Sequence, residues 1–142
     1  MSSVVLGYDE SEGSHAALDA ALTVAAKFEE QLVLVYAVGP PGAVGEEYRA
    51  HRDALTQMGR HALDGAVEQA RQAGVPTTVE LVDAKPADAL LSVAEKYDAS
   101  VIVVGIVGES PLRSIILGST PNKLLHLSNR PVLCVPRSTD DD

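Results

Sequence analysis

Cysteine and aromatic residues are scarce in this chain of 142 residues, which contains no tryptophan, one phenylalanine, four tyrosines and one cysteine. A single cysteine excludes an internal disulfide, and Cys134 has no neighbouring cysteine with which to form a metal site. Because Cys134 lies in the apolar run 132–135, we interpret it as a buried, unreactive thiol. No apolar run approaches the roughly 18–20 residues of a membrane helix. The first residues also show no basic region or cleavage site of a secretory signal, so we expect a soluble, cytoplasmic protein.

Basic residues are also few, with 11 Lys and Arg against 20 Asp and Glu, for a net charge of −9. A nucleic-acid surface needs clustered Lys and Arg to neutralise phosphates, so this composition argues against such a surface. The absence of a long apolar run likewise argues against a membrane partner. An acidic chain can still bind a small anion through backbone N–H groups, a helix N-terminus or a metal ion. Any anion site here therefore has to rely on one of these three devices.

Short β-branched runs alternate with helical patterns along the chain. We expect strands at 4–6, 32–38, 77–82, 101–104 and 132–135. We expect helices from the cap Ser11 to about 28, from about 46 to 73, from Pro86 to 97, and at 122–126. Three of the strands are apolar on both faces, which predicts an α/β domain whose parallel sheet is covered by helices on both sides. We assign one domain to 1–137 and a disordered acidic tail to 138–142.

Apolar spacings of three and four residues identify the expected buried face of each long helix. For the first helix these residues are Ala17, Ala20, Ala21, Val24, Ala25 and Phe28. For the second they are Tyr48, His51, Leu55, Met58, Ala62, Ala66, Ala70 and Ala73, with Gly74 and Pro76 ending the helix. For the third they are Leu90, Val93, Ala94 and Tyr97.

The segment after the fourth strand has the clearest chemical signal. Gly105 and Gly108 are followed, after nine residues, by Gly118 and Ser119. Glycines allow positive φ and leave room for a phosphate, and Ser119 and Thr120 offer N–H groups at the start of a helix. Pro121 suits the first turn of that helix. Because ligands bind beyond the carboxyl ends of parallel strands, this segment predicts a phosphate site at that edge.

This spacing, Gly–x2–Gly–x9–Gly–Ser, resembles that of the universal stress protein family. The opening run Val5-Leu6-Gly7-Tyr8-Asp9-Glu10-Ser11 looks like the family's first strand with its Asp-x-Ser. The run Asn129-Arg130-Pro131-Val132-Leu133-Cys134-Val135 looks like its closing strand. The resemblance implies an open, Rossmann-like sheet of order 3-2-1-4-5, of the adenine nucleotide alpha hydrolase-like type. It also implies a homodimer that pairs through the edge strand Val132–Val135.

In ATP-binding members, the resemblance implies that Asp9 meets the ribose or adenine, that backbone near Ala37 meets the adenine edge, and that the glycines, Ser119 and Thr120 hold the phosphates. The full set of expected nucleotide-binding residues is Gly7, Tyr8, Asp9, Ala37, Val104, Gly105, Gly108, Gly118, Ser119 and Thr120. We expect the nucleotide to be ATP, with AMP and cyclic AMP as open alternatives, since one phosphate would suit the loop as well as three.

The chain departs from the family pattern between and after the first two glycines. Ile106, Val107 and Glu109 stand where members often carry polar or basic residues, and Ser100 stands where many have Asp. An acidic Glu109 beside a triphosphate predicts that Mg²⁺ or Mn²⁺ accompanies ATP. We expect no protein-held metal site, because His51 and His61 lie ten residues apart and fall on different faces of one helix.

No nucleophile elbow, Cys–His pair or Walker-type Gly-Lys-Ser/Thr is present, and no catalytic residues converge. We therefore expect a stress-response or regulatory protein that binds a nucleotide and is not an enzyme. Two alternatives stay open. One is a nucleotide-independent protein-interaction module with a vestigial loop and an unknown regulatory partner, suggested by Ile106, Val107 and Glu109. The other is a very weak ATPase using Asp9 and Glu109.

Overall fold

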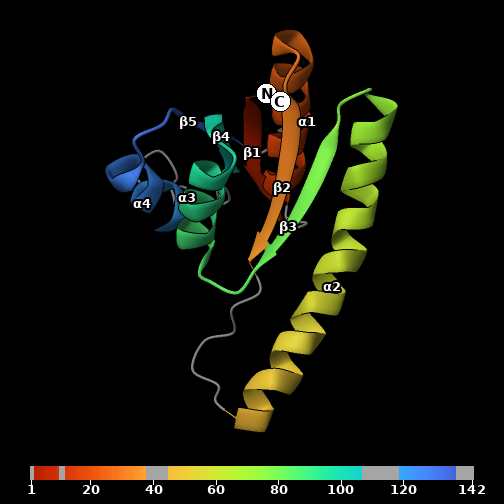
Figure 1. The fold of residues 1–142 in the computed structure, drawn as a ribbon, viewed down its shortest axis with the longest axis vertical. Coiled ribbons are helices and arrows are strands. Elements are labelled where there is room, and N and C mark those ends of the chain that lie inside the picture. The colour runs from red at the N-terminus through yellow and green to blue at the C-terminus, as the bar shows by residue number, and fades with distance from the viewer. Residues whose placement is uncertain (1, 10–11, 38–44, 107–118, 137–142) are drawn as a thin grey trace.

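Five parallel strands form one sheet in the computed structural model, which describes residues 2–9, 12–37, 45–106 and 119–136 (Figure 1). The strands are β1 (Ser3–Gly7), β2 (Gln31–Ala37), β3 (Thr77–Val82), β4 (Ala99–Gly105) and β5 (Val132–Val135). Their order is β3-β2-β1-β4-β5, and every neighbouring pair is parallel. The predicted α/β class and strand order are confirmed. The predicted cap Ser11 and the acidic tail at 138–142 lie outside the described residues.

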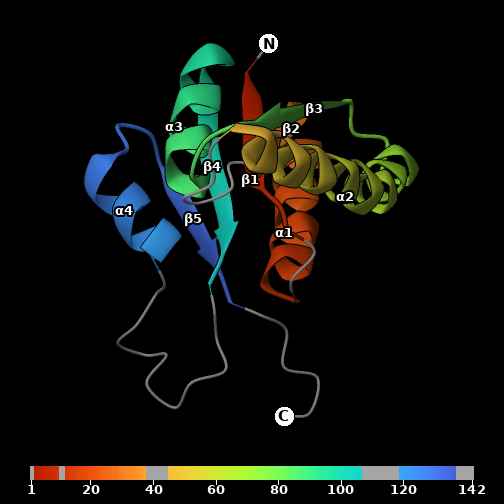
Figure 2. The same ribbon diagram turned by 90° about the horizontal axis from the view of Figure 1, so that it is seen from below.

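Helices cover both faces of this sheet. They are α1 (Glu12–Phe28), α2 (Gly45–Gln72), α3 (Pro86–Lys96) and α4 (Ser119–Leu127). Figure 2 shows α1 and α2 on one side of the sheet and α3 and α4 on the other. Local signals set two of the helix ends. Pro86 begins α3, where its missing N–H is harmless, and Gly74 follows α2 with φ 74°. No helix of the described segments is long and apolar enough to span a bilayer.

The alternation of strand side chains divides the core into two layers. Val4 and Leu6 pack with α1 and α2, whereas Val5 packs with α3 and α4. Each layer also takes residues from β2 and β4, so the central strands are apolar on both faces, as the sequence predicts.

Phe28 is the main error in the predicted core, because its side chain is 69% exposed. It has the correct helical phase, one turn after the buried Ala25. However, the 17 residues of α1 rise about 25 Å, whereas the five-residue β1 spans about 17 Å. The last turn of α1 therefore extends beyond the sheet. Buried Leu18 and Leu22, which the predicted face omitted, do much of the packing instead.

The predicted stripe of α2 is partly confirmed, since Ala66 and Ala70 are buried. Ala73 is exposed, because α2 ends at Gln72 and Ala73 lies in the turn that follows. Leu63, which the predicted stripe omitted, is buried as well. The side chains of the other predicted members lie outside the described residues, namely Tyr48, His51, Leu55, Met58 and Ala62. On α3, Leu90, Val93 and Ala94 are buried as predicted, and half-buried Tyr97 follows the end of the helix.

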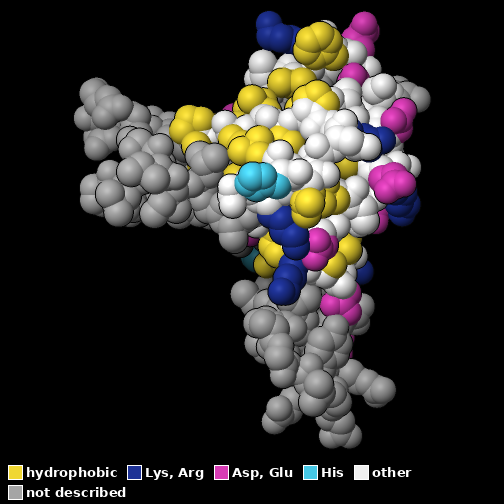
Figure 3. All heavy atoms as spheres, turned by 90° about the vertical axis from the view of Figure 1, so that its left-hand side faces the viewer, with side chains coloured by type: hydrophobic (Ala, Val, Ile, Leu, Met, Phe, Trp, Pro, Cys, Tyr) yellow, Lys and Arg dark blue, Asp and Glu magenta, His cyan; other side chains and the backbone are white. Residues whose placement is uncertain are grey.

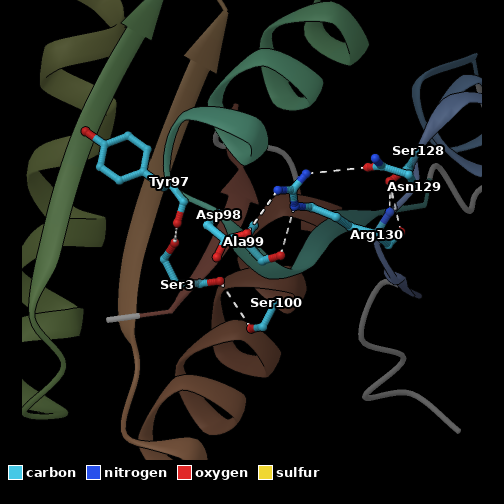
Figure 4. A network of polar contacts seen from close by, with 8 residues as sticks. All are labelled: Ser3, Tyr97, Asp98, Ala99, Ser100, Ser128, Asn129 and Arg130. Atoms are coloured by element: carbon cyan, nitrogen blue, oxygen red, sulfur yellow. Dashed lines mark hydrogen bonds and ion pairs between the residues drawn. The ribbon is translucent and has the colours of Figure 1, made fainter.

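At the amino ends of the strands, Arg130 joins two segments that are distant in sequence (Figure 4). Its Nε donates to the carbonyl of Ala99 over 3.1 Å, and its guanidinium pairs with Asp98 at 3.2 Å. Asp98 has φ 51°, in the tight turn between α3 and β4. Arg130 therefore ties the start of β5 to the start of β4, at the edge opposite to the predicted site.

Ser100, which has no function in the sequence interpretation, belongs to the same polar network. Its hydroxyl lies 2.5 Å from a carboxylate oxygen of Glu30 and 3.2 Å from the carbonyl oxygen of Ser3. The Ser3 hydroxyl in turn donates to the carbonyl of Tyr97 over 2.9 Å. These contacts give Ser100 a structural role at the amino ends of β1, β2 and β4.

Candidate functional site

The strand order reverses direction between β1 and β4. From β1 the chain proceeds to β2 and β3 on one side, and then returns to place β4 on the other side. In open parallel sheets such a switch point, at the carboxyl ends of the strands, is where ligands bind. Here it brings together the residues after β1, at 7–9, and the residues at the end of β4, at 104–106.

Three of the predicted site residues lie on the face covered by α3 and α4. Val104 is buried there and Ala37 packs against the same cluster. Gly7 lies on this face too, since a Cβ at its position would come within 3.0 Å of Leu90 Cδ1. Small residues at the ends of β1 and β2 thus bring the backbone close to α3 at this edge. These three residues therefore pack toward the α3 and α4 side at the edge where the site is predicted.

Tyr8 belongs to the opposite face. Its ring is buried among the residues that pack under α1, and its hydroxyl lies 3.2 Å from Nδ1 of His15. The two rings meet edge to face, with centroids 5.6 Å apart. The Tyr8 amide donates to the carbonyl of Val35. The side chain of Tyr8 therefore anchors the first turn of α1 to the sheet.

Asp9 lies at the exposed edge directly after β1 and is held by Ser14. The Asp9 amide donates to the Ser14 hydroxyl over 3.0 Å, and this hydroxyl donates to Asp9 Oδ1 over 2.5 Å. Ser14 is buried and fixes the direction in which the Asp9 carboxylate points. Sequence reasoning named Asp9 and missed Ser14. The sequence feature that could have predicted the Ser14–Asp9 contact is a serine in the first turn of a helix, five residues after an aspartate at the end of a strand.

Gly105 is required for a reason different from the one predicted. Among the described glycines only Gly74 has a positive φ, so Gly105 is not in the left-handed region. A Cβ at Gly105 would lie 2.3 Å from the carbonyl oxygen of Gly13 and 2.4 Å from its carbonyl carbon. The missing side chain thus allows the first turn of α1 to lie directly on the end of β4. Gly13 was also absent from the predicted site.

Ile106 limits which backbone groups can reach a phosphate. Its amide donates to the carbonyl of Val135 over 2.9 Å, which extends the pairing of β4 with β5. The Ile106 amide is therefore already used and is not available to a phosphate. Gly108, Glu109 and Gly118 lie outside the described residues.

The predicted helix start after the loop is confirmed, because α4 begins at Ser119 and Thr120 is its second residue. The described helix is longer than the predicted 122–126, and Pro121 is buried in its first turn. Lys123 is the nearby cation on this helix. Its ammonium pairs with Asp88 of α3 at 3.1 Å, with both side chains substantially exposed.

The described residues contain no group of three or more His, Cys, Asp or Glu side chains that could hold a metal ion. The Mg²⁺ or Mn²⁺ expected to accompany ATP stays a prediction. Cys134 is half-buried, less enclosed than predicted, and packs against the core layer under α3 and α4. Burial raises the pKa of the Cys134 thiol, which keeps it protonated and weakly nucleophilic.

A five-stranded parallel sheet of this order, with small residues and a helix start at its switch point, defines a Rossmann-like α/β protein. The model of the universal stress protein family matches residues 1–136. The chain therefore belongs to the universal stress protein family.

Individual relatives agree with this assignment. Universal stress protein YxiE of Bacillus subtilis is 31% identical over 144 aligned residues, which cover 93% of this chain and 97% of YxiE. A crystal structure of a universal stress protein in complex with cAMP is 28% identical, with a TM-score of 0.73 over 96% of this chain and 98% of that one. The structure of MJ0577 of Methanocaldococcus jannaschii has a TM-score of 0.86 at 22% identity, covers 98% of both chains and supports the fold.

Proposed function

We propose that this protein binds ATP or a related adenine nucleotide at the carboxyl edge between β1 and β4, as a stress-response or regulatory module and not as an enzyme. The observation that carries the proposal is the placement of Asp9, Gly105 and the start of α4 at the carboxyl edge of the sheet, where the strand order reverses. Support comes from the related universal stress protein solved in complex with cAMP, which is 28% identical and matches 96% of this chain.

The two sides of the site suit the two ends of a nucleotide. The partly buried Gly7 and Ala37 at the ends of β1 and β2 are the residues that would meet adenine, with backbone near Ala37 at the ring nitrogens, and the buried Val104 supports them from the core. Asp9, held by Ser14, is placed to accept a hydrogen bond from a ribose hydroxyl. The phosphates then extend toward Gly108, Gly118 and the N–H groups of Ser119 and Thr120.

Charge supports a metal-assisted complex. The chain carries a net charge of −9, and Lys123 is paired with Asp88. Adding a triphosphate to such a surface is unfavourable unless a divalent cation neutralises part of its charge. We therefore propose that ATP binds as its Mg²⁺ or Mn²⁺ complex, and that AMP and cyclic AMP depend less on the metal.

We further propose that the protein is a homodimer that pairs through β5. This strand lies at the end of the sheet, and Leu133 on it is 37% exposed. On adjacent α4, Leu125 is 51% and Leu127 is 59% exposed. Figure 3 views the side where α4 and β5 lie, and apolar side chains gather across this face. An uncovered apolar edge strand invites pairing with another chain, which a second copy would complete.

Isothermal titration with Mg-ATP, AMP and cyclic AMP tests the nucleotide proposal, with Gly118→Ala as the loop variant. Gly105→Ala is unsuitable for this purpose because a methyl group there meets the backbone of Gly13. We expect saturable binding by the intact protein and a clear loss of affinity in Gly118→Ala. No heat of binding at millimolar nucleotide, from protein shown to be folded, would refute the proposal.

The same preparation separates the alternatives. Phosphate release equal to that of buffer, from protein that binds ATP, supports a non-catalytic module and removes the weak ATPase. A partner protein bound equally well with and without nucleotide would favour the nucleotide-independent interaction module. The cytoplasmic location stays a prediction from the sequence.

A further inference from the structure

A contact between two glycines joins the parts of the chain that form the candidate site. Gly13 lies in the first turn of α1, and Gly105 is the last residue of β4. A Cβ at Gly105 would lie 2.3 Å from Gly13 O and 2.9 Å from Gly13 Cα. A Cβ at Gly13 would lie 3.2 Å from the carbonyl oxygen of Ile106. The two backbones therefore touch without intervening side chains.

The next residue connects this same turn to the other strand of the site. Ser14 is buried and bonds both the amide and the carboxylate of Asp9, directly after β1. Consecutive residues of α1 thus contact the ends of both β1 and β4. The position of Asp9 relative to Gly105 depends on how closely this turn lies on β4.

We propose that Gly13 is a positioning residue of the nucleotide site, an inference that rests on the proposed function. Its missing side chain lets the first turn of α1 approach Ile106. Ser14 lies in the same turn and is hydrogen-bonded to Asp9, so the position of the turn also sets the position of Asp9. An added Cβ would push the turn away from Ile106 by a few tenths of an ångström. Asp9 would move with Ser14, away from its place beside the residues at the end of β4. Contacts at the ribose and at the phosphates could then no longer be optimal together.

Gly65 provides a matched control. It lies in the interior of α2, and a Cβ there would have no heavy atom within 4 Å. Gly13 also lies within a helix and has no positive φ, so alanine is compatible with its backbone. The pairs Gly13→Ala with Gly65→Ala, and Gly13→Val with Gly65→Val, therefore differ mainly in what surrounds the new side chain.

Each variant is titrated with Mg-ATP by calorimetry, and the midpoint temperature of its thermal unfolding is measured without nucleotide. We expect affinity to fall about threefold in Gly13→Ala and about tenfold or more in Gly13→Val, with a midpoint in Gly13→Ala close to that of wild type. Both Gly65 variants should bind like wild type. In amide NMR spectra of the nucleotide-free protein, the chemical shifts of Asp9, Ser14 and Ile106 should change in the Gly13 variants and not in the Gly65 variants.

Several outcomes would overturn the proposal. Wild-type affinity in Gly13→Val would show that the turn does not position the site. A midpoint that falls so far that the lost binding only tracks unfolded protein would reduce Gly13 to a packing residue. If wild type itself fails to bind Mg-ATP, the proposed function fails, and the inference built on it falls as well. If wild type binds Mg-ATP and the Gly13 variants bind it with the same affinity, the inference about Gly13 fails while the proposed function stands.

Discussion

Replacing Gly105 by alanine tests the contact between β4 and α1 without any nucleotide. The added Cβ would lie 2.3 Å from Gly13 O and 2.4 Å from Gly13 C, both of them backbone atoms. An ordinary contact begins near 3.4 Å, so the two segments have to separate by about 1 Å. No side-chain rotation can relieve this overlap.

The separation is opposed by the packing behind it. Leu18 and Ala21 of α1 are buried against the sheet, and Gly105 is paired with Val135 of β5. Overpacking a core typically costs about 1–3 kcal/mol, and backbone displacement places this case at the upper end. We expect Gly105→Ala to lower the free energy of unfolding by about 3 kcal/mol or more, a large share of the roughly 5–15 kcal/mol of a typical domain.

Urea unfolding followed by circular dichroism measures this loss. We expect a lower midpoint with an unchanged m-value, since the surface exposed on unfolding should stay the same. Gly65→Ala is the control and should be more stable than wild type by about 0.5–1 kcal/mol, because alanine is the better helix former at an open position. A Gly105→Ala free energy of unfolding within about 0.5 kcal/mol of wild type would refute the close contact.

Three further predictions concern stability. Gly74→Ala should lower the free energy of unfolding by about 1 kcal/mol in thermal or urea melts, because residue 74 has φ 74°; an unchanged stability would contradict a left-handed cap after α2. Phe28→Ser should change it by less than about 0.5 kcal/mol because the ring is 69% exposed, and a core-sized loss would show that the last turn of α1 is covered. One hydrogen bond from the Tyr97 hydroxyl, and then the contact with Lys96, lower the pKa of Glu80. The contribution of Glu80 to the free energy of unfolding is therefore full above its ordinary pKa and is lost as the pH falls through the lowered value. The stability difference between wild type and Glu80→Gln should therefore shrink on acidification, and a difference that grows would contradict this sign.

Much of the fold could be predicted from local signals in the sequence. The strands at 77–82 and 132–135 match the structure, and Pro86 and Gly74 marked helix ends that the structure confirms. Proline and glycine act through their own backbone preferences, so their effects can be predicted without knowing the neighbours. Strand order came from family resemblance, and the sheet confirms it.

The candidate site could be predicted in outline. Asp9, Gly105 and the helix start at Ser119 lie at one sheet edge because parallel strands present their carboxyl ends together. The exposed Phe28, the Lys123–Asp88 pair and the Gly13–Gly105 contact could not be predicted in this way. Each depends on the distance between segments that are far apart in the sequence.

The sequence by itself determined the elements, the two-faced apolar core and the edge at which chemistry is expected, because backbone preference and hydrophobic period are local properties. Only the tertiary structure decided why Gly105 has to be glycine. Its neighbour is Gly13, 92 residues earlier in the chain, and the need for glycine comes from backbone atoms that meet there, not from the φ of Gly105 itself. Contacts of this kind arise when two elements are packed together, and no local pattern encodes them.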